Sequence, residues 1–359
     1  MRIAVIGTRG EVPAEDGVDR ALGEICPRLA RRGHEIDVFS DRNGRAITPV
    51  EGARMIRLPA VPTGFGPASH ALVSSLLTAF RGYDVVNFVA SDATGLFTMA
   101  SKLGLHRTVV SVHGLGRSEP PTRFPRLGPE TAAARFADVI TVVSRRLERF
   151  FRDVYGRETI FIPNGIDPAA RPPSPEAVVG LGLMPHGYLL VADRLVPESG
   201  IHHAVAALRS LPPGVRLVVA ETGPGDDAYR AAVRSAAAPD RVLFLGSVPP
   251  PLLDALVAHA RLYVLPSSRD EPAPTLLQAL AHGQAAVVSD LPEHLEMVGA
   301  DGFSFTSGDV GDLRRVLAWL LDDPEVVARM RLRAAATAAH RYSWDRIADA
   351  YEQVYASIA

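Results

Sequence analysis

The run Leu189-Leu190-Val191-Ala192-Asp193-Arg194 places four apolar residues directly before two charged ones. Short apolar runs without polar alternation are typical of parallel strands that helices cover on both faces. Similar runs recur at residues 215–220, 242–245, 262–265 and 286–288. Helix-like segments separate them, at 201–209, 227–237, 250–259 and 275–282. This alternation predicts a doubly wound α/β domain.

The first half of the chain has the same alternation. Its strand-like runs are residues 2–6, 35–39, 84–89, 108–112, 139–143 and 159–162. Its helix-like segments are residues 21–32, 69–80 and 145–155. We therefore expect two Rossmann-like domains, residues 1–167 and 168–341, which meet in a Pro-rich stretch and face a cleft. Ligands of such sheets bind outside the carboxyl ends of the strands.

The composition narrows the classes of function. The 359 residues are 47% hydrophobic and 22% charged, as in ordinary globular proteins. A formal net charge of −2 offers no basic field for nucleic acid. Cys26 is the single cysteine, which excludes an internal disulfide and suits a reducing, cytoplasmic setting. No apolar run reaches the roughly 20 residues of a transmembrane helix, which leaves only peripheral membrane contact open.

Two features of the second half suit a phosphate group. Arg194 follows a strand, where its planar, permanently charged guanidinium would face the cleft. A helix expected to start near Thr275 would add free N–H groups and the positive end of its dipole. Two structural alternatives stay open. Arg194 could pair with Glu198 on the surface, and Thr275 with Gln278 could form a capping box.

The remaining candidates are single residues. His113 follows a strand of the first domain, and one histidine in such a place is either structural or catalytic. Gly10 lies in a loop that lacks the tight turn of a dinucleotide fingerprint. His202 and His203 are adjacent on an expected helix, so their side chains point to different faces and cannot share one metal ion. Asp226 is typical of the residue that caps the start of a helix. No metal site or cofactor is therefore expected.

Seven segments in order resemble glycosyltransferase family 4, nearest its rhamnosyltransferase-like branch, over nearly the whole chain. They are residues 1–10 (MRIAVIGTRG), 33–35 (GHE), 111–114 (SVHG), 161–167 (FIPNGID), 194–201 (RLVPESGI), 244–248 (FLGSV) and 273–279 (APTLLQA). The resemblance implies a GT-B fold. It also implies that the last helix, residues 342–359, returns to the first domain and buries an apolar stripe of Tyr342, Trp344, Ile347, Tyr351, Val354 and Tyr355.

The resemblance implies a role for each matching residue. His113 would lie near the donor sugar, with Asp270 or Glu271 orienting sugar hydroxyls. The implied donor-binding residues are Gly10, Arg194, Ser199, Val248, Pro274, Thr275, Leu276 and Gln278. The loop with Asp16, Gly17 and Asp19 would lie on the acceptor side. Among the implied donor-binding residues, Ser199 replaces a phosphate-binding lysine of the family and Gln278 replaces a ribose-binding glutamate, and the loop with Asp16, Gly17 and Asp19 also departs from the family's usual pattern.

The expected function is transfer of a hexosyl or rhamnosyl group, with retention, from a UDP-, dTDP- or GDP-sugar. The acceptor would be a sugar or a glycosylated small molecule or lipid-linked compound. Catalysis would proceed by positioning and by stabilising the departing diphosphate, without a metal. Two alternatives remain: a catalytically silent GT-B partner protein, which the changes at Ser199 and Gln278 would suit, and a sugar-nucleotide epimerase.

Overall fold

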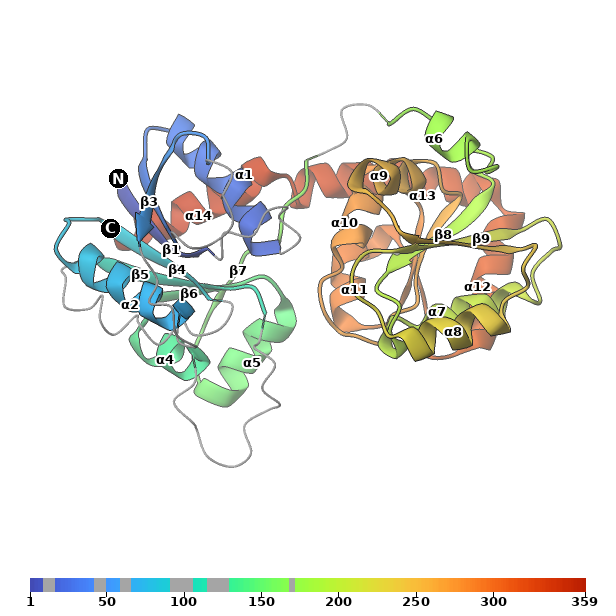
Figure 1. Cartoon of the computed structure of the whole chain (residues 1–359), viewed down its shortest axis with the longest axis horizontal. Helices are drawn as coiled ribbons and strands as arrows, with labels where there is room; N and C mark the ends of the chain where they lie inside the picture. The colour runs from blue at the N-terminus through green and yellow to red at the C-terminus, as the bar shows by residue number, and fades with distance from the viewer. Residues whose placement is uncertain (9–16, 42–49, 59–65, 91–105, 115–128, 168–171) are drawn as a thin grey trace. The chain divides into compact units, whose positions relative to one another are not determined.

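The computed structural model describes the chain except residues 9–16, 42–49, 59–65, 91–105, 115–128 and 168–171. The chain divides into two compact units. Unit 1 joins Met1–Gly165 with Trp344–Ala359, and unit 2 is Ile166–Ser343. Each unit contains its own parallel sheet with helices on both faces, which confirms the predicted GT-B fold class (Figure 1).

The sheet of unit 1 has the strand order β3-β2-β1-β4-β5-β6-β7. Its strands are β1 (Arg2–Thr8), β2 (Glu35–Asp41), β3 (Ala53–Leu58), β4 (Val85–Ala90), β5 (Arg107–Val112), β6 (Val139–Val142) and β7 (Ile160–Phe161). Its helices are α1 (Gly17–Arg31), α2 (Gly66–Ala79), α4 (Pro129–Phe136), α5 (Arg145–Tyr155) and α14 (Trp344–Ile358).

The strands of unit 1 are apolar because both faces of the sheet are covered. Ile3 and Val5 point to the face covered by α1 and α14. Ala4 and Ile6 point to the opposite face, where α4 and α5 contribute Ala133, Leu147 and Phe151. The last helix of the chain therefore completes one of the two cores of the first unit, as the resemblance implies.

The predicted stripe of the last helix divides between the two units. Trp344, Ile347, Tyr351, Val354 and Tyr355 are buried in the core of unit 1. Tyr342 instead belongs to the core of unit 2, because α13 ends at Arg341 and the chain turns before α14 begins at Trp344. The expectation that all six residues share one buried face is wrong at Tyr342.

The sheet of unit 2 has the order β10-β9-β8-β11-β12-β13. Its strands are β8 (Tyr188–Asp193), β9 (Arg216–Glu221), β10 (Val242–Ser247), β11 (Leu262–Leu265), β12 (Ala286–Ser289) and β13 (Phe303–Phe305). Its helical segments are α6 (Glu176–Val179), η2 (Pro197–Ser199), α7 (Ile201–Leu208), α8 (Asp227–Ala236), α9 (Pro250–Ala258), α10 (Pro274–Ala281), α11 (Pro292–Val298), η3 (Gly299–Asp301), α12 (Val310–Asp322) and α13 (Pro324–Arg341).

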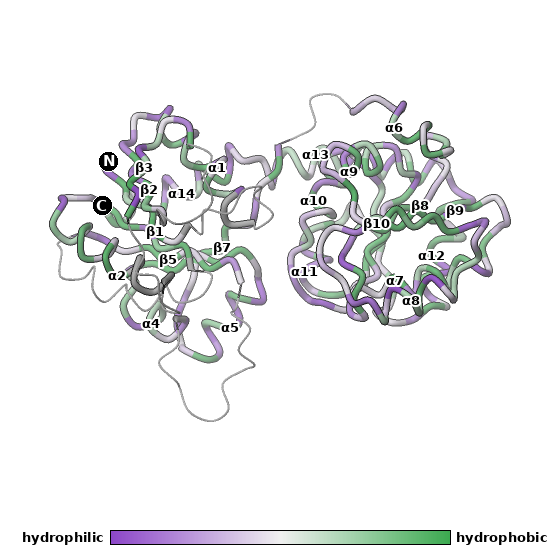
Figure 2. Tube along the Cα trace, viewed as in Figure 1, coloured by the Kyte–Doolittle hydropathy of each residue, from purple (hydrophilic) through white to green (hydrophobic). Residues whose placement is uncertain are grey.

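The side chains of β8 point alternately into two hydrophobic cores, one on each face of the sheet of unit 2. Leu190 and Ala192 pack with α9, α10 and α13, whereas Leu189 and Val191 pack with α7 and α12. Figure 2 shows the apolar residues of β8 and β9 inside the unit. The apolar run Leu189–Ala192 thus lies in a central strand, β8, and the charged Asp193 and Arg194 that follow it lie at the carboxyl edge of the sheet.

Candidate functional site

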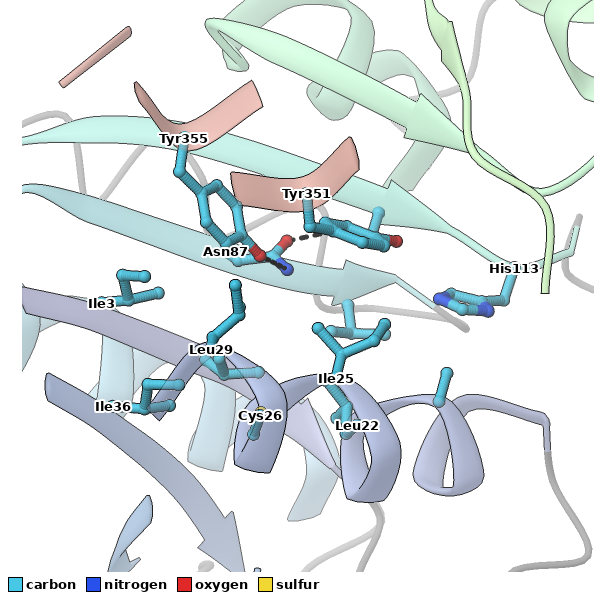
Figure 3. Close-up of a pocket in the computed structure, with 14 residues that line it drawn as sticks. Ile3, Leu22, Ile25, Cys26, Leu29, Ile36, Asn87, His113, Tyr351 and Tyr355 are labelled. Atoms are coloured by element: carbon cyan, nitrogen blue, oxygen red, sulfur yellow. Dashed lines mark hydrogen bonds between the residues drawn. The ribbon is translucent and has the colours of Figure 1, made fainter. Parts of the chain in front are cut away.

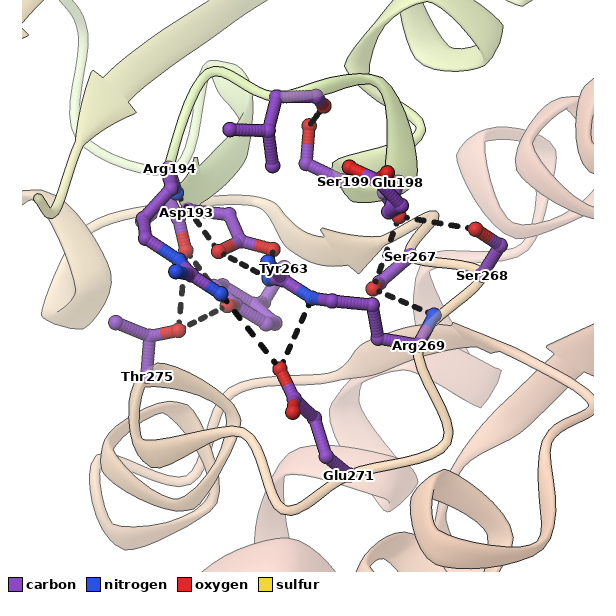
Figure 4. A network of polar contacts seen from close by, with 12 residues as sticks. Asp193, Arg194, Glu198, Ser199, Tyr263, Ser267, Ser268, Arg269, Glu271 and Thr275 are labelled. Carbon is purple, nitrogen blue, oxygen red and sulfur yellow. Dashed lines mark hydrogen bonds and ion pairs between the residues drawn. The ribbon is translucent and has the colours of Figure 1, made fainter. Parts of the chain in front are cut away.

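The strand order creates a switch point between β8 and β11. The chain leaves β8 toward β9 on one side, and β11 lies on the other side of β8. Doubly wound sheets bind ligands outside the carboxyl ends of strands at such a point. The residues after β8 and those between β11 and α10 meet there (Figure 4).

Arg194 lies immediately after β8, with 46% of its side chain exposed. Its Nη2 lies 3.8 Å from Oε1 of Glu271, which is also exposed. The surface pairing with Glu198 that the sequence left open is therefore replaced by a loose contact with Glu271. An ion pair this exposed is weak, so the guanidinium remains available to a ligand.

A second arginine, Arg269, lies beside Arg194. Its Nη2 donates to both carboxylate oxygens of Asp193, each at 2.9 Å. Its Nε lies 3.0 Å from Oε1 of Glu271, so this carboxylate lies between the two guanidinium groups. We call Asp193, Arg194, Arg269 and Glu271 the arginine cluster. Arg269 was not among the residues predicted from the sequence, although an arginine in the loop between β11 and α10 was the available signal.

Backbone contacts hold the arginine cluster in place. The Glu198 carbonyl accepts a hydrogen bond from the Ser268 N–H at 2.8 Å, which joins the segment after β8 to the segment after β11. Gly200 makes this approach possible, because its φ is 66° and a Cβ there would lie 1.9 Å from the Pro266 carbonyl oxygen. A side chain at Gly200 would separate the two segments.

Ser199 does not reach the surface of this site. The residue is fully buried, and its hydroxyl donates to the Val196 carbonyl at 2.7 Å within η2. A direct contact between this side chain and a donor, which the resemblance implied, is inconsistent with that position. The physical reason is that a short hydroxyl satisfies a nearby carbonyl, whereas a lysine would extend beyond it.

Helix α10 begins at Pro274, one residue before the predicted start. The N–H groups of Thr275 and Leu276 lie in its first turn and lack an acceptor within the helix. The Thr275 hydroxyl donates to the Ala192 carbonyl at 3.0 Å and accepts from the Tyr263 hydroxyl at 2.7 Å. These contacts fix the first turn of α10 against the ends of β8 and β11.

The capping-box alternative is wrong. The N-cap residue of α10 is Ala273, which makes no side-chain cap. Gln278 instead donates from Nε2 to Asp254 Oδ1 on α9, at 2.9 Å. His282 Nε2 lies 2.6 Å from the same oxygen. Gln278 is therefore part of a contact between α9 and α10, and this contact engages only its amide nitrogen.

The other predicted residues of unit 2 lie at the same edge of the sheet. Asp270 accepts from the Glu293 N–H at 2.9 Å and so anchors the start of α11. Val248 follows β10 and is partly buried against the unit 2 core. His294 is a further residue that sequence reasoning missed. It is buried, and this desolvation lowers its pKa, with smaller opposing effects of Asp270 and Asp193 and a small lowering by Arg269.

In unit 1, His113 follows β5, which ends at Val112. Desolvation lowers its pKa to about 4, and the nearby Asn164 side chain opposes the shift. Within the described part of the chain, neither His113 Nδ1 nor Asn164 Oδ1 has a hydrogen-bond partner. The ring is neutral at pH 7, so it can act as a hydrogen-bonding group but carries no positive charge.

A cavity of about 10 Å³ lies beside this ring, between α1, the sheet and α14 (Figure 3). This volume is about that of one water molecule, so the cavity belongs to the core and does not fit a sugar. Gly10 and Asp16 lie outside the described residues. Gly17 and Asp19 lie in the first turn of α1.

Comparisons with known proteins agree with this architecture. A family model described as "Glycosyltransferase Family 4" matches residues 16–170, and one described as "Glycosyl transferases group 1" matches residues 184–337. The phosphatidyl-myo-inositol mannosyltransferase of Mycolicibacterium smegmatis is 25% identical over 100% of this chain and 94% of its own length. The glycogen synthase of Mycobacterium tuberculosis is 30% identical over 63% of this chain, which spans only 56% of that relative.

Solved structures share the fold. Anabaena HepE in complex with UDP has a TM-score of 0.81 at 22% identity, and the match covers 99% of this chain and 100% of HepE. The sucrose-phosphate synthase of Thermosynechococcus elongatus has a TM-score of 0.80 at 21% identity, with 99% and 98% covered.

The two sheets, the switch point of unit 2 and the matches to solved structures define a GT-B fold, and both family models are models of glycosyltransferases. The chain resembles glycosyltransferase family 4, whose model matches its first half, and its second half matches a second glycosyltransferase model. Among the described helices, none combines the length and apolar character needed to cross a bilayer.

Proposed function

We propose that this protein transfers a sugar, with retention, from a nucleoside-diphosphate donor to an acceptor hydroxyl. The observation that carries the proposal is the placement of Arg194 and the first turn of α10 together at the switch point of unit 2. Both features stabilise negative charge. They suit the diphosphate, whose charge grows as it leaves the sugar.

The other residues take supporting roles in this proposal. Glu271 is exposed and free to accept from sugar hydroxyls once the arginines bind phosphate. Asp270 acts by anchoring α11, and the neutral ring of His113 is assigned to the donor sugar as a hydrogen-bonding group. The proposal includes no metal, because Arg194 and the first turn of α10 can both stabilise the charge of the departing diphosphate.

The donor should be identified with a panel of UDP-, GDP- and dTDP-sugars in a thermal-shift assay, because a ligand of the native state raises the melting temperature. One structural relative was solved with UDP, and one curated relative is named a GDP-mannose-dependent mannosyltransferase.

The acceptor panel should include a phosphatidylinositol lipid and 2-deoxystreptamine, which appear in the names of relatives. The active donor is then assayed with and without EDTA, where equal rates support metal independence.

Arg194→Ala tests the site directly. The substitution removes charge-assisted hydrogen bonds worth roughly 1.5–3 kcal/mol, so donor affinity should fall about tenfold or more while the fold survives. Arg315→Ala, on the exposed face of α12, is the matched control and should bind as the parent does. A folded Arg194→Ala protein that binds every donor normally would contradict the diphosphate assignment.

One observation favours a second candidate, a catalytically silent GT-B protein. Ser199 is buried and Gln278 is bonded to Asp254, so two donor-binding positions of the family make other contacts here. Donor binding without release of nucleoside diphosphate in the presence of any acceptor would support this candidate. Interconversion of free donors would instead indicate an epimerase.

A further inference from the structure

The arginine cluster contains two positive and two negative side chains, so its formal net charge is zero. A nucleoside diphosphate bears at least two negative charges and needs a positive site. Arg194 alone, with Glu271 beside it, supplies little net charge. Within the cluster, Arg269 is the only other positive side chain.

The geometry of Arg269 leaves room for a ligand. Only 19% of its side chain is exposed, and both hydrogen bonds to Asp193 come from one nitrogen, Nη2. Its Nη1 has no hydrogen-bond partner among the described residues. Because a guanidinium presents five N–H donors in a plane, Arg269 can donate to phosphate oxygens from its free edge.

Asp193 fixes the position of this guanidinium. Its Oδ1 also accepts from the backbone N–H of Arg194 at 2.7 Å, and 14% of its side chain is exposed. The carboxylate is therefore held at the end of β8, and it holds Arg269, which lies in the segment after the neighbouring strand β11. A diphosphate at the switch point would be a second anion beside the same guanidinium.

We propose that Arg269 is a second diphosphate-binding residue, and that Asp193 is its resident counter-anion, which competes with the donor for this guanidinium. The proposal rests on the proposed function, because it assumes a donor diphosphate at the switch point of unit 2. It assigns the second positive charge to the segment after β11 and not to η2, where Ser199 is buried.

Three variants test it, with UDP and GDP as probes and affinity measured by calorimetry. Arg269→Ala should weaken binding about tenfold or more. Asp193→Asn keeps an oxygen acceptor for the Arg194 N–H but removes the charge, so affinity should rise about two- to fivefold. The double variant restores the parent's net charge, yet it should still bind about tenfold more weakly than Asp193→Asn alone and more weakly than the parent.

The alternative is that the Asp193–Arg269 pair only braces two segments. Both single substitutions would then weaken binding, and UMP or GMP would lose as much affinity as the diphosphates. A double variant that binds like the parent would also overturn the proposal. Arg194→Ala tests the proposed function separately from the role of Arg269. If Arg194→Ala weakens binding of UDP and GDP but Arg269→Ala does not, the diphosphate site stands and only the role of Arg269 is wrong. A parent protein that binds neither UDP nor GDP would overturn both proposals.

Discussion

At the scale of single residues, the burial of His113 makes the stability of the folded protein depend on pH. Its folded-state pKa is about 4, below the ordinary value of 6.5. A group whose pKa is lowered on folding stabilises the native state above its unfolded pKa, and this stabilisation is lost as pH falls toward the folded pKa. The group thus favours the folded form at pH 7 relative to pH 4.

His113→Gln should therefore reduce the loss in free energy of unfolding that accompanies a fall in pH. Between pH 6.5 and 4 the parent should lose up to about 3 kcal/mol more than the variant, a difference set by the pKa shift. Denaturant unfolding at several pH values measures it. Parallel pH profiles for the two proteins would show that His113 is not the titrating group.

Gln278→Glu distinguishes a structural contact from a ribose contact. A glutamate at this position would place a second carboxylate beside Asp254 in place of the present hydrogen bond. We expect a loss of stability on the order of 1 kcal/mol, seen as a lower melting temperature, with donor affinity unchanged. Asp254→Asn in the same chain should restore most of the loss. Tighter donor binding by Gln278→Glu would instead place residue 278 at the ribose.

At the scale of elements, a buried polar network fixes how α14 packs in unit 1. Asn87 on β4 donates to the Tyr355 hydroxyl at 2.8 Å and accepts from Ser111 on β5 at 2.9 Å. Thr141 on β6 donates to Ser111, also at 2.9 Å. The network joins three strands to one helix, so a shift of α14 along the sheet would leave buried polar atoms unpaired.

Tyr355→Phe should consequently destabilise unit 1 by about 1–3 kcal/mol, because the Asn87 amide would keep a buried donor without an acceptor. Ser357→Ala is the control on the same helix, since its hydroxyl bonds the Val354 carbonyl on the exposed side. Thermal unfolding compares the two variants. Equal melting temperatures would mean that the network does not hold the helix.

The sequence predicted central elements better than edges and loop contacts. β8 was predicted because a strand buried on both faces needs consecutive apolar residues. β3 was missed, since this edge strand carries the exposed Arg54 and Arg57 and lacks such a run. Arg194 was predicted from its place after a strand. The pairing of Arg269 with Asp193 could not be predicted, because it depends on which strands are neighbours.

At the scale of the whole molecule, the chain passes between the units twice. Gly165 ends the first part of unit 1 and packs against the Trp344 ring, which opens the second part. One residue further on, Ile166 pairs with Ser343 in unit 2, and its N–H donates to the Tyr342 carbonyl at 2.7 Å. The two passages therefore run side by side.

Gly165→Ala should test how tightly these passages pack. A Cβ at this position would lie 2.3 Å from the Trp344 ring, so the ring must move out of a fully packed site. Overpacking of this kind costs about 1–3 kcal/mol, which the melting temperature of the variant should reveal. Trp344→Phe should tolerate Gly165→Ala better than the parent does. Additive losses in the double variant would argue against this contact as the cause.

The position of α14 also has a consequence during protein synthesis. Leu22, Ile25 and Leu29 of α1 pack against residues of α14, which the ribosome makes only after all of unit 2. At about 5–20 residues per second, translating Ile166–Ser343 takes roughly 10 to 40 s. During that interval the apolar face of α1 lacks its final partner. Unit 1 therefore completes this core only after the ribosome has made both of its parts, although most of its residues are synthesised before unit 2.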